Sequence, residues 1–236
     1  MTTTAGPTTR EAGRPTDPAV RVRRVAERGH YDAATIDAIL DEALICHVAF
    51  VAPDGRPMVI PTLHARDGDR LLLHMSSGSR LARAARSTPV PVSVAVTLVD
   101  GIVLARSAFH HSMNYRSVVI VGTASTLTSE ADTRAALDRF TDHVVPGRAA
   151  AVRGPTRREL AATAVLTVDL AHASAKIRTG GVNDEPEDLA LPIWAGVLPL
   201  RLVAGEPESD AALPGDLPVP DHVRAHPLVA DLTAPA

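Results

Sequence analysis

The sequence has little of several residue types that mark particular protein classes. Its single cysteine, Cys46, excludes an internal disulfide, and its single tryptophan, Trp194, cannot belong to an aromatic core when aromatic residues make up 3% of the chain. A net charge of −3 provides no overall attraction to nucleic acid or to an anionic membrane. No apolar run approaches the roughly 20 residues that a membrane-spanning helix needs, and the first residues lack the pattern of a secretion signal. We therefore expect a cytoplasmic protein that binds neither nucleic acid nor membrane.

Several catalytic signatures are absent as well. None of the ten histidines belongs to a His-Glu-x-x-His motif, and the adjacent His110 and His111 cannot both point inward from a regular strand, so no metal site is predicted. The sequence contains neither a Gly-x-Ser-x-Gly elbow nor a Walker loop, which argues against a hydrolase of that type and against a nucleoside triphosphatase.

What the chain does contain is one segment of globular character between two Pro- and Thr-rich ends. Hydrophobic residues make up 45% of the sequence, which is enough for a proper core. Residues 1–19 and 204–236 hold few large apolar side chains and several prolines, and we expect both to be mobile or extended. The predicted division is a flexible segment at 1–19, a folded domain at 20–203 and a Pro-rich tail at 204–236.

Within the domain, short strands follow one another closely. Asp32 is placed to cap a helix whose apolar face includes Ile36, Ile39 and Leu40. Strands are predicted at 46–52, 58–65, 70–75, 91–98, 115–128 and 164–170, with turns at 53–56, 67–69 and 100–101 and helices beginning near 79, 129 and 156. Consecutive strands with helices at the edges indicate a mainly β (α+β) protein: an antiparallel barrel of about six strands with peripheral helices.

The junction after the third strand is the most informative local pattern. An apolar run ends at Ser76, Ser77 and Ser79, and a helical pattern resumes at Arg80. Hydroxyl groups, free backbone N–H groups and a guanidinium brought to one spot suit a phosphorylated ligand. The same residues are also typical of a plain helix cap and turn, so this segment alone leaves both interpretations open.

The order of motifs resembles the pyridoxamine-5′-phosphate-oxidase-like, FMN-binding split-barrel superfamily, in particular its flavin-nucleotide-binding and nitroimidazole-resistance branch. The resemblance rests on the first helix, then 46–50, 56–62, 72–80 and 115–122 in this order, and it extends over about residues 20–200. It implies a homodimer of six-stranded split barrels with FMN held in grooves between the subunits. It also implies an oxidoreductase that acts on a small organic acceptor.

The resemblance assigns candidate roles to particular residues. The strand that lies along the flavin ring corresponds to Met58, Val59, Ile60, Pro61 and Thr62, and the next strand ends beside the flavin at His74 and Met75. Phosphate binding is implied for Ser76, Ser77, Ser79 and Arg80. Further contacts are implied for Asn114, Tyr115, Arg116 and Ser117, and Trp194 is a candidate to stack on the ring. The alternative for each of these residues is an ordinary structural role in the core, a loop or a solvated face.

Two departures from the pattern bear on the reaction. Leu81 stands where the oxidases carry a phosphate-binding lysine, and Ser117 replaces their glutamine, which argues against pyridoxal-phosphate synthesis. Three alternatives stay open: a deazaflavin-dependent protein, a non-catalytic flavin carrier, and a haem protein with His64, His110 or His111 as axial ligand. His30, just before the first helix, is a further candidate without an assigned role.

Overall fold

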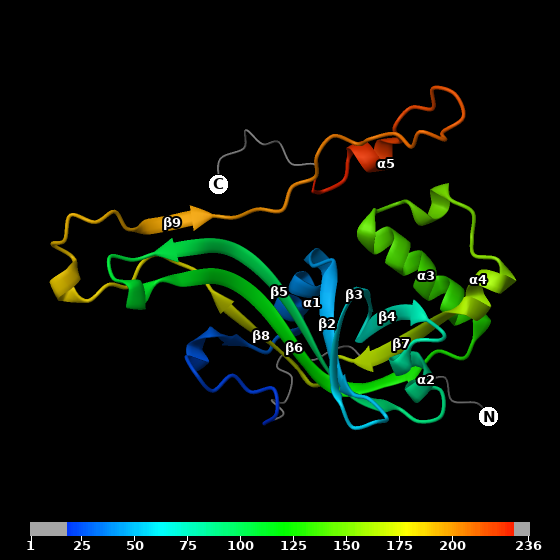
Figure 1. The fold of residues 1–236 in the computed structure, drawn as a ribbon, viewed down its shortest axis with the longest axis horizontal. Coiled ribbons are helices and arrows are strands. Elements are labelled where there is room, and N and C mark those ends of the chain that lie inside the picture. The colour runs from blue at the N-terminus through cyan, green and yellow to red at the C-terminus, as the bar shows by residue number, and fades with distance from the viewer. Residues whose placement is uncertain (1–17, 229–236) are drawn as a thin grey trace.

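The computed structural model describes residues 18–228, so most of the predicted flexible segment at 1–19 and the last residues of the predicted tail lie outside the described residues. The elements are arranged as Figure 1 shows. The strands are β1 (Gly29–His30), β2 (Ile45–Val51), β3 (Pro57–Asp67), β4 (Arg70–Ser76), β5 (Val90–Leu104), β6 (Ser112–Thr126), β7 (Thr163–Asp169), β8 (Ala173–Arg178) and β9 (Gly196–Pro199). The helices are α1 (Ala33–Glu42), α2 (Arg80–Ala85), α3 (Glu130–Val144), α4 (Arg157–Ala162) and α5 (Asp221–Arg224).

Six of these strands close into a ring. Antiparallel pairing runs in the order β6-β7-β4-β3-β2-β5, and β5 pairs with β6 again, which completes the circuit. These are the six strands that the sequence predicts, and the predicted antiparallel split barrel is confirmed. Strands β8 and β1 extend the sheet beyond β6, and β9 pairs with the far end of β5.

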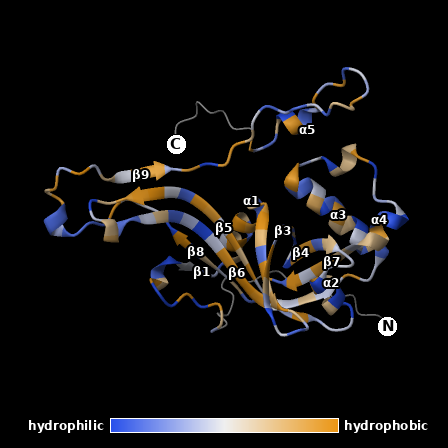
Figure 2. Cartoon of the chain, in the orientation of Figure 1, coloured by the Kyte–Doolittle hydropathy of each residue, from blue (hydrophilic) through white to orange (hydrophobic). Residues whose placement is uncertain are grey.

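The barrel interior is aliphatic, as the hydropathy colouring in Figure 2 illustrates. Alternate residues of β2 and β5, among them Val48, Val94 and Val96, are fully buried, and α1 closes one end of the core with Ile36 and Leu40. A second, smaller cluster lies between β3, β4, β7 and α3 and includes Leu72, Ala136 and Phe140. Side chains that alternate along each strand therefore point in turn into the barrel core and away from it.

Local capping explains why the helices begin where the sequence predicts. The Asp32 carboxylate accepts the Thr35 N–H at 2.8 Å and the Ser129 hydroxyl accepts the Asp132 N–H. Thr156 and Glu159 form a reciprocal capping box at the start of α4. Among the described residues, no helix has the length and apolar character needed to cross a membrane.

The turn predicted at Asp100 and Gly101 is wrong. Strand β5 continues through both residues to Leu104, with a register shift between Val99 and Gly101 where it faces β6. The glycine serves a close approach instead, because an added Cβ would lie 3.1 Å from the Leu198 carbonyl oxygen and from Val197 of β9. The Asp-Gly pair, which in sequence is typical of a turn, therefore marks a bulge within a continuous strand.

After β9 the chain runs back along the molecule as an extended arm and ends with the short helix α5 near the C-terminal end of α3 (Figure 1). His226 of this arm hydrogen-bonds to the Val144 carbonyl of α3, so the arm contacts the domain at this point. Of the predicted tail at 204–236, the structure therefore describes residues 204–228 as a segment attached to α3.

Candidate functional site

The barrel is split between β3 and β4. These two strands pair only from His64 opposite Leu73 to Asp67 opposite Arg70, whereas β3 pairs with β2 along its earlier residues, from Pro57 to Leu63. Between residues 57 and 62, the edge of β3 that faces away from β2 therefore has backbone N–H and C=O groups without a strand partner. An open strand edge of this kind can donate and accept hydrogen bonds to a flat polar ligand.

Side chains alternate along this part of β3, which contains the predicted Met58, Val59, Ile60, Pro61 and Thr62. Met58 and Ile60 pack against the barrel core, while Val59 is 62% exposed. The Thr62 hydroxyl donates to the His74 carbonyl oxygen at 3.4 Å, where β3 and β4 begin to separate. The predicted residues thus lie beside the gap between β3 and β4, with Met58 and Ile60 facing the core and Val59 and Pro61 facing outward.

The loop that follows β4 lies at the same opening and is held in a defined turn. Ser76 Oγ accepts the Gly78 N–H, and Ser79 Oγ accepts the Ala82 N–H as the cap of α2, both at 3.2 Å. The Ser77 N–H donates to the Ala162 carbonyl oxygen at 2.8 Å. The capping interpretation is therefore confirmed for Ser79 and the turn interpretation for Ser76, and because these two hydroxyls only accept in those bonds, their protons stay able to donate to a ligand.

Arg80 joins this loop to the open edge of β3. Its guanidinium contacts the Met58 sulfur at 3.7 Å, and the side chain is exposed. A second guanidinium, that of Arg86, donates to the Ser77 carbonyl oxygen at 2.7 Å and fixes the loop from the other end of α2. The structure thus brings Met58 and Thr62 of β3 together with Met75, the three serines and Arg80 around one opening.

The second predicted group lies on β6 and is engaged in structural contacts. Asn114 donates to the Gly180 carbonyl oxygen at 3.1 Å and accepts from Arg178, and Ser117 donates to the Lys176 carbonyl oxygen at 3.2 Å. Tyr115 is half-buried opposite Val99 and Arg178. This group therefore ties β6 to β8 and to the loop that follows β8.

Arg116 is held between two carboxylates. Its guanidinium binds Glu42 of α1 and both carboxylate oxygens of Asp100, at 2.8 and 3.0 Å for the latter. The hydrogen bonds that Arg116 donates to Glu42, followed by those it donates to Asp100, raise the pKa of Arg116 above its already high ordinary value. A ligand anion would have to compete with these two partners, so Arg116 contributes less to anion binding than the sequence pattern implies.

One chain does not bring the two groups together. Met58 lies opposite Phe50, Phe50 opposite Val92, and Val92 opposite Gly122 of β6. Tyr115 lies seven residues from Gly122 along β6, which at the strand rise corresponds to roughly 23 Å. Trp194 is farther still in this direction, because it precedes β9, which pairs with β5 beyond Asp100.

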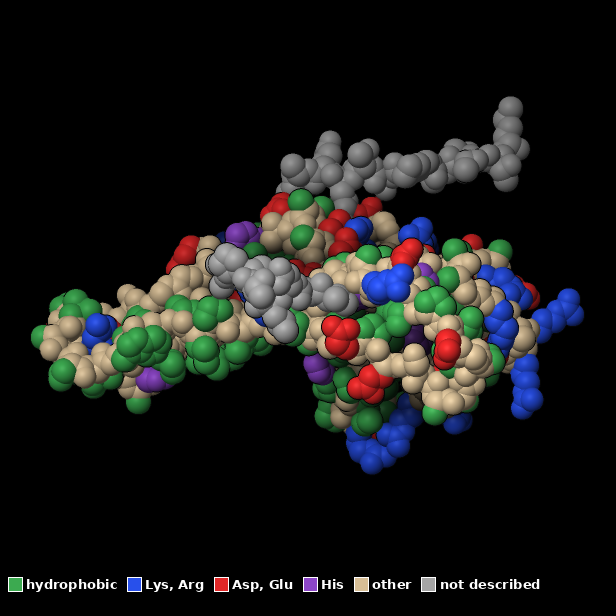
Figure 3. Space-filling view, turned by 90° about the horizontal axis from the view of Figure 1, so that it is seen from above, with side chains coloured by type: hydrophobic (Ala, Val, Ile, Leu, Met, Phe, Trp, Pro, Cys, Tyr) green, Lys and Arg blue, Asp and Glu red, His purple; other side chains and the backbone are tan. Residues whose placement is uncertain are grey.

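Trp194 lies in an exposed apolar tip, which we define as Phe109, Leu189, Leu191, Ile193 and Trp194. Phe109 is 90% and Trp194 68% exposed. Figure 3 shows apolar side chains gathered at this end of the molecule, over the tips of β5 and β6 and the start of β9. The tryptophan ring also packs on Gly196, where an added Cβ would lie 2.9 Å from the ring.

His74 faces a cavity on the other side of β4 from the barrel core. The cavity has a volume of about 490 Å³ and is bounded by α3, α4 and the loop between them, through Leu137, Phe140, Val152 and Arg153. The imidazole meets the Phe140 ring edge-on at 4.7 Å, and burial lowers the pKa of His74. Burial therefore favours the neutral imidazole, whose lone pair is suited to bind a metal centre.

This cavity is a feature that the sequence patterns do not reveal. The sequence assigns His74 to the flavin, whereas the structure turns its side chain toward Phe140 and Arg153, which belong to no motif. Arg153 forms an ion pair with Glu159 of α4 at 2.6 Å. The alternation of side chains along a strand could have revealed this. Leu73 and Met75 face the main core, so His74 between them must lie on the opposite face of β4.

The other candidate histidines are engaged elsewhere. His64 is fully buried, its Nε2 bonds to the Leu40 carbonyl oxygen at 2.9 Å, and burial lowers its pKa to about 4. His110 lies 3.5 Å from Glu185, and Nδ1 of the exposed His111 donates to the Ser107 carbonyl oxygen. His30 lies on β1 beside β8. None of these four lines the cavity at His74.

Comparison with known proteins places this geometry in context. The sequence profile of the pyridoxamine 5′-phosphate oxidase family matches residues 32–177, and no curated protein matches the chain. Among solved structures, the flavocytochrome Anf3 from Azotobacter vinelandii is 37% identical, with a TM-score of 0.84 over 91% of this chain and 100% of that one. An FAD and haem binding protein from Mycobacterium smegmatis is also 37% identical, with a TM-score of 0.79 over 84% of this chain and 97% of that one.

A more distant structure shares the fold alone. It is a 5-nitroimidazole antibiotic resistance protein from Bacteroides thetaiotaomicron, which is 20% identical, with a TM-score of 0.53 over 63% of this chain and 86% of that one.

Proposed function

This chain belongs to the pyridoxamine 5′-phosphate oxidase family, and from that premise we propose that it is a flavin-binding oxidoreductase. The observation that carries the proposal is the opening between β3 and β4, where unpaired backbone groups of β3 lie beside the serine loop and Arg80. The two similar structures described above are named as a flavocytochrome and as an FAD and haem binding protein, which supports the same assignment.

In this proposal, different residues of the opening bind different parts of the flavin. The hydroxyl groups of Ser77 and Ser79 and the guanidinium of Arg80 bind the phosphate next to the ribityl chain. Backbone groups of β3 between residues 58 and 62 bind the polar edge of the ring, while Met58 and Met75 cover its apolar part. A bound flavin supplies the redox chemistry, and the chain positions it and excludes water. We propose FMN as the cofactor, and FAD shares the part that this opening would hold.

The principal test is the cofactor of the purified protein. We expect a yellow protein with the absorption bands of oxidised flavin, and chromatography of the released cofactor distinguishes FMN from FAD. Arg80→Ala is expected to weaken flavin binding at least tenfold, because a charge-assisted phosphate contact contributes roughly 1.5–3 kcal/mol. Arg70→Ala, at the opposite end of β4 in an exposed pair with Asp67, is the matched control and should bind normally.

Several outcomes would contradict this assignment. A colourless protein that takes up only a deazaflavin excludes FMN and FAD, and unchanged flavin affinity in Arg80→Ala removes Arg80 from the site. Oxidation of NAD(P)H no faster than with free flavin, with nitroaromatic, quinone and enone acceptors present, favours a flavin carrier over an oxidoreductase.

We also propose that the functional unit is a homodimer. In one chain Tyr115 lies roughly 23 Å along β6 from Gly122, the residue in register with Met58 at the opening, so a ligand that contacts both groups needs one group from each copy. The outward faces of β2, β3, β5 and β6 are apolar, and Ile45, Val51, Val59, Val99 and Val119 are between 39% and 63% exposed. Large exposed apolar patches of this kind mark interaction surfaces.

We expect light scattering to report a mass of two chains. Val59→Lys should yield monomers, because it places a charge in the middle of the apolar face without entering the core. Lysine at Val152, which is also exposed but lies near α4, is the control and should leave the dimer intact. A monomeric wild-type protein, or a dimeric Val59→Lys variant, would rule out this interface.

The cavity at His74 favours a second cofactor, a haem. Its donor set fits, because burial favours the neutral form of His74 and no described residue forms a hydrogen bond with its ring nitrogens. Leu137, Phe140 and Val152 would cover the apolar face of the porphyrin, and Arg153 could pair with a propionate. Bound there, haem would supply one-electron chemistry, and His74 is the residue that would hold its iron. The names of the two 37%-identical structures support this second proposal.

A further inference from the structure

A groove of about 340 Å³ lies beside the serine loop, between α2 and α4, and we call it the α2–α4 groove. The loop is fixed to both helices, because the Ser77 N–H donates to the Ala162 carbonyl oxygen of α4 and Arg86, at the end of α2, donates to the Ser77 carbonyl oxygen. Small-molecule sites begin at about 300 Å³, so the groove is large enough to hold a ligand. Ser77 lines it and also belongs to the opening proposed for the flavin.

The floor of the groove is apolar and belongs to the folded domain. Ala82 of α2 and Val165 of β7 are each 1% exposed, and Leu127, Leu160 and Ala161 line the groove beside them. Alanine at two of these positions leaves room that a larger side chain would fill. The floor therefore accepts an apolar ring from a ligand.

Two arginine side chains line the same groove and are available to an anion. Arg86 uses one N–H group for the Ser77 carbonyl oxygen, and its other N–H groups form no hydrogen bond with a described residue. Arg157, in the first turn of α4, is exposed and forms no hydrogen bond or ion pair with a described residue. Guanidinium groups without a carboxylate partner favour phosphate as a ligand.

Glu130 is the only acidic residue among the described residues that line the groove, and its charge is already balanced. Its Oε1 accepts two hydrogen bonds from Arg134, at 2.9 and 3.2 Å. Its Oε2 accepts none from a described residue. The charges of Arg86 and Arg157 are therefore not cancelled, while one carboxylate oxygen can still accept a hydroxyl group.

The hydroxyl groups of the groove divide into two kinds. Thr126, Thr133 and Thr163 donate to backbone carbonyl oxygens of their own surroundings. The hydroxyls of Ser77 and Thr128 form no hydrogen bond with a described residue. The polar groups available to a ligand are thus two guanidinium groups, two hydroxyls and one carboxylate oxygen, arranged around an apolar floor.

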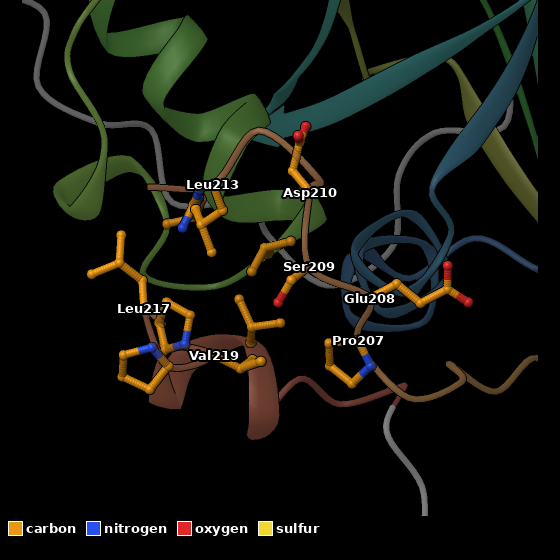
Figure 4. Close-up of a pocket in the computed structure, with 12 residues that line it drawn as sticks. Pro207, Glu208, Ser209, Asp210, Leu213, Leu217 and Val219 are labelled. Carbon is orange, nitrogen blue, oxygen red and sulfur yellow. The ribbon is translucent and has the colours of Figure 1, made fainter. Parts of the chain in front are cut away.

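A larger cavity, of about 630 Å³, lies at the C-terminal arm and has a different character. In Figure 4, Leu213, Leu217 and Val219 point toward one another, whereas the carboxylates of Glu208 and Asp210 point away. Its single arginine, Arg148, already bonds to His222. This cavity has no pair of available cations, so an anionic ligand is expected in the α2–α4 groove instead.

We propose that the α2–α4 groove binds a nucleoside 5′-phosphate. Arg86, Arg157 and the Ser77 hydroxyl bind the phosphate. Oε2 of Glu130 and the Thr128 hydroxyl bind the sugar, as carboxylates bind ribose in other nucleotide sites, and the base covers the apolar floor.

This nucleotide has two possible sources with the same chemistry. It is either the AMP half of FAD, which continues from the flavin phosphate at Ser77, or a free mononucleotide bound beside FMN. The first source rests on the flavin function proposed above, whereas the second does not. The test therefore identifies the source as well as the site.

The test is a calorimetric titration of the full-length protein, as purified, with AMP, together with chromatography of any flavin that it releases. A protein that holds FMN, or no flavin, should bind AMP saturably, and Arg157→Ala should weaken this binding at least tenfold because a charge-assisted contact is lost. A protein that holds FAD should not bind AMP, since the groove is filled. In that case Arg157→Ala should weaken FAD binding at least tenfold and leave FMN binding unchanged.

Matched variants and probes separate this site from general effects of charge. Arg158→Ala, at the next position of α4, removes an exposed cation that does not line the groove and should behave as the wild type. Ala161→Trp should produce the same loss as Arg157→Ala without a change of charge, because the indole fills the floor. Inorganic phosphate should bind at least tenfold more weakly than AMP.

Three results would overturn the proposal. The first is a protein without FAD that does not bind AMP. The second is a variant Arg157→Ala that keeps the wild-type affinity for AMP or FAD, or that loses no more than Arg158→Ala. The third is equal affinity for phosphate and AMP, which would reduce the groove to an anion site. A protein without any flavin would contradict the proposed function, but its titration with AMP would still decide whether the groove binds a nucleotide.

Discussion

Replacement of His74 by alanine is expected to abolish the Soret band of the purified protein while its flavin absorption stays. In the proposed haem site, the imidazole is the only nitrogen ligand among the described residues that line the cavity, and the substitution removes it. The flavin should remain because the opening that would hold it is formed by β3, the serine loop and Arg80, on the other side of β4. Absorption spectra of wild-type and variant protein, purified with added haem precursor, provide the measurement.

Control variants decide between this histidine and the alternatives. His110→Ala and His111→Ala lie in the turn before β6, away from the cavity, and should keep the band. Phe140→Leu should shift it, because the phenyl ring meets the imidazole edge-on and fixes its plane. A Soret band that survives in His74→Ala and disappears in a turn variant would assign the axial ligand to the turn, and a wild-type protein without the band would exclude haem altogether.

Most of the fold is predictable because the local signals and the tertiary structure agree. Caps at Asp32, Ser129 and Thr156 determine where helices begin, and glycine turns at residues 55 and 68 have the positive φ values that the turns around them require. In each of the six strands of the ring, apolar and polar residues alternate or the residues are continuously apolar, so the sequence pattern predicts each strand. These signals act within a few residues, which is the range that sequence patterns report.

The elements that the sequence does not predict depend on long-range pairing. Strand β8 consists largely of small residues, such as Ala173, Ser174 and Ala175, which are buried once β8 pairs with β6 beside the main core. Strand β9 has four residues, the last of them Pro199, and forms because Gly101 lets it approach β5. The site residues on β6 could not be interpreted from local sequence for the same reason. No residue next to Arg116 in the sequence indicates that Glu42 and Asp100 bind its guanidinium.

The candidate site divides along the same line. The serine loop and Arg80 are adjacent in sequence and at the opening in the structure, so their grouping could be predicted. The cavity at His74 combines β4 with residues of α3 and α4 more than 60 positions away, and only the packing of those helices on the sheet creates it. The sequence assigns His74 to the flavin, and the structure places its side chain against Phe140 at this cavity, so the flavin role of His74 stays a prediction.

Acid is expected to destabilise the fold, and His64 is the residue most responsible. Burial, the largest effect, lowers its pKa from 6.5 to about 4, and the nearby His143 acts in the same direction. The unfolded chain therefore binds a proton that the folded protein excludes, so the free energy of unfolding decreases as the pH falls through the interval from 6.5 to 4. A difference of this size corresponds to about 3 kcal/mol, a large part of the stability of a typical domain.

Urea unfolding at a series of pH values measures this dependence, and His64→Gln isolates it. Glutamine can still donate to the Leu40 carbonyl oxygen, which His64 reaches from β3, but it cannot take up a proton. The loss of stability between pH 7 and pH 4 should therefore be smaller by about 3 kcal/mol in the variant than in the wild type. His74, whose pKa burial also lowers, should account for part of the remaining dependence, since its neutral form is likewise favoured by folding. An equal loss in both proteins would show that the buried imidazole keeps an ordinary affinity for protons, and would shift the origin of acid sensitivity to other groups.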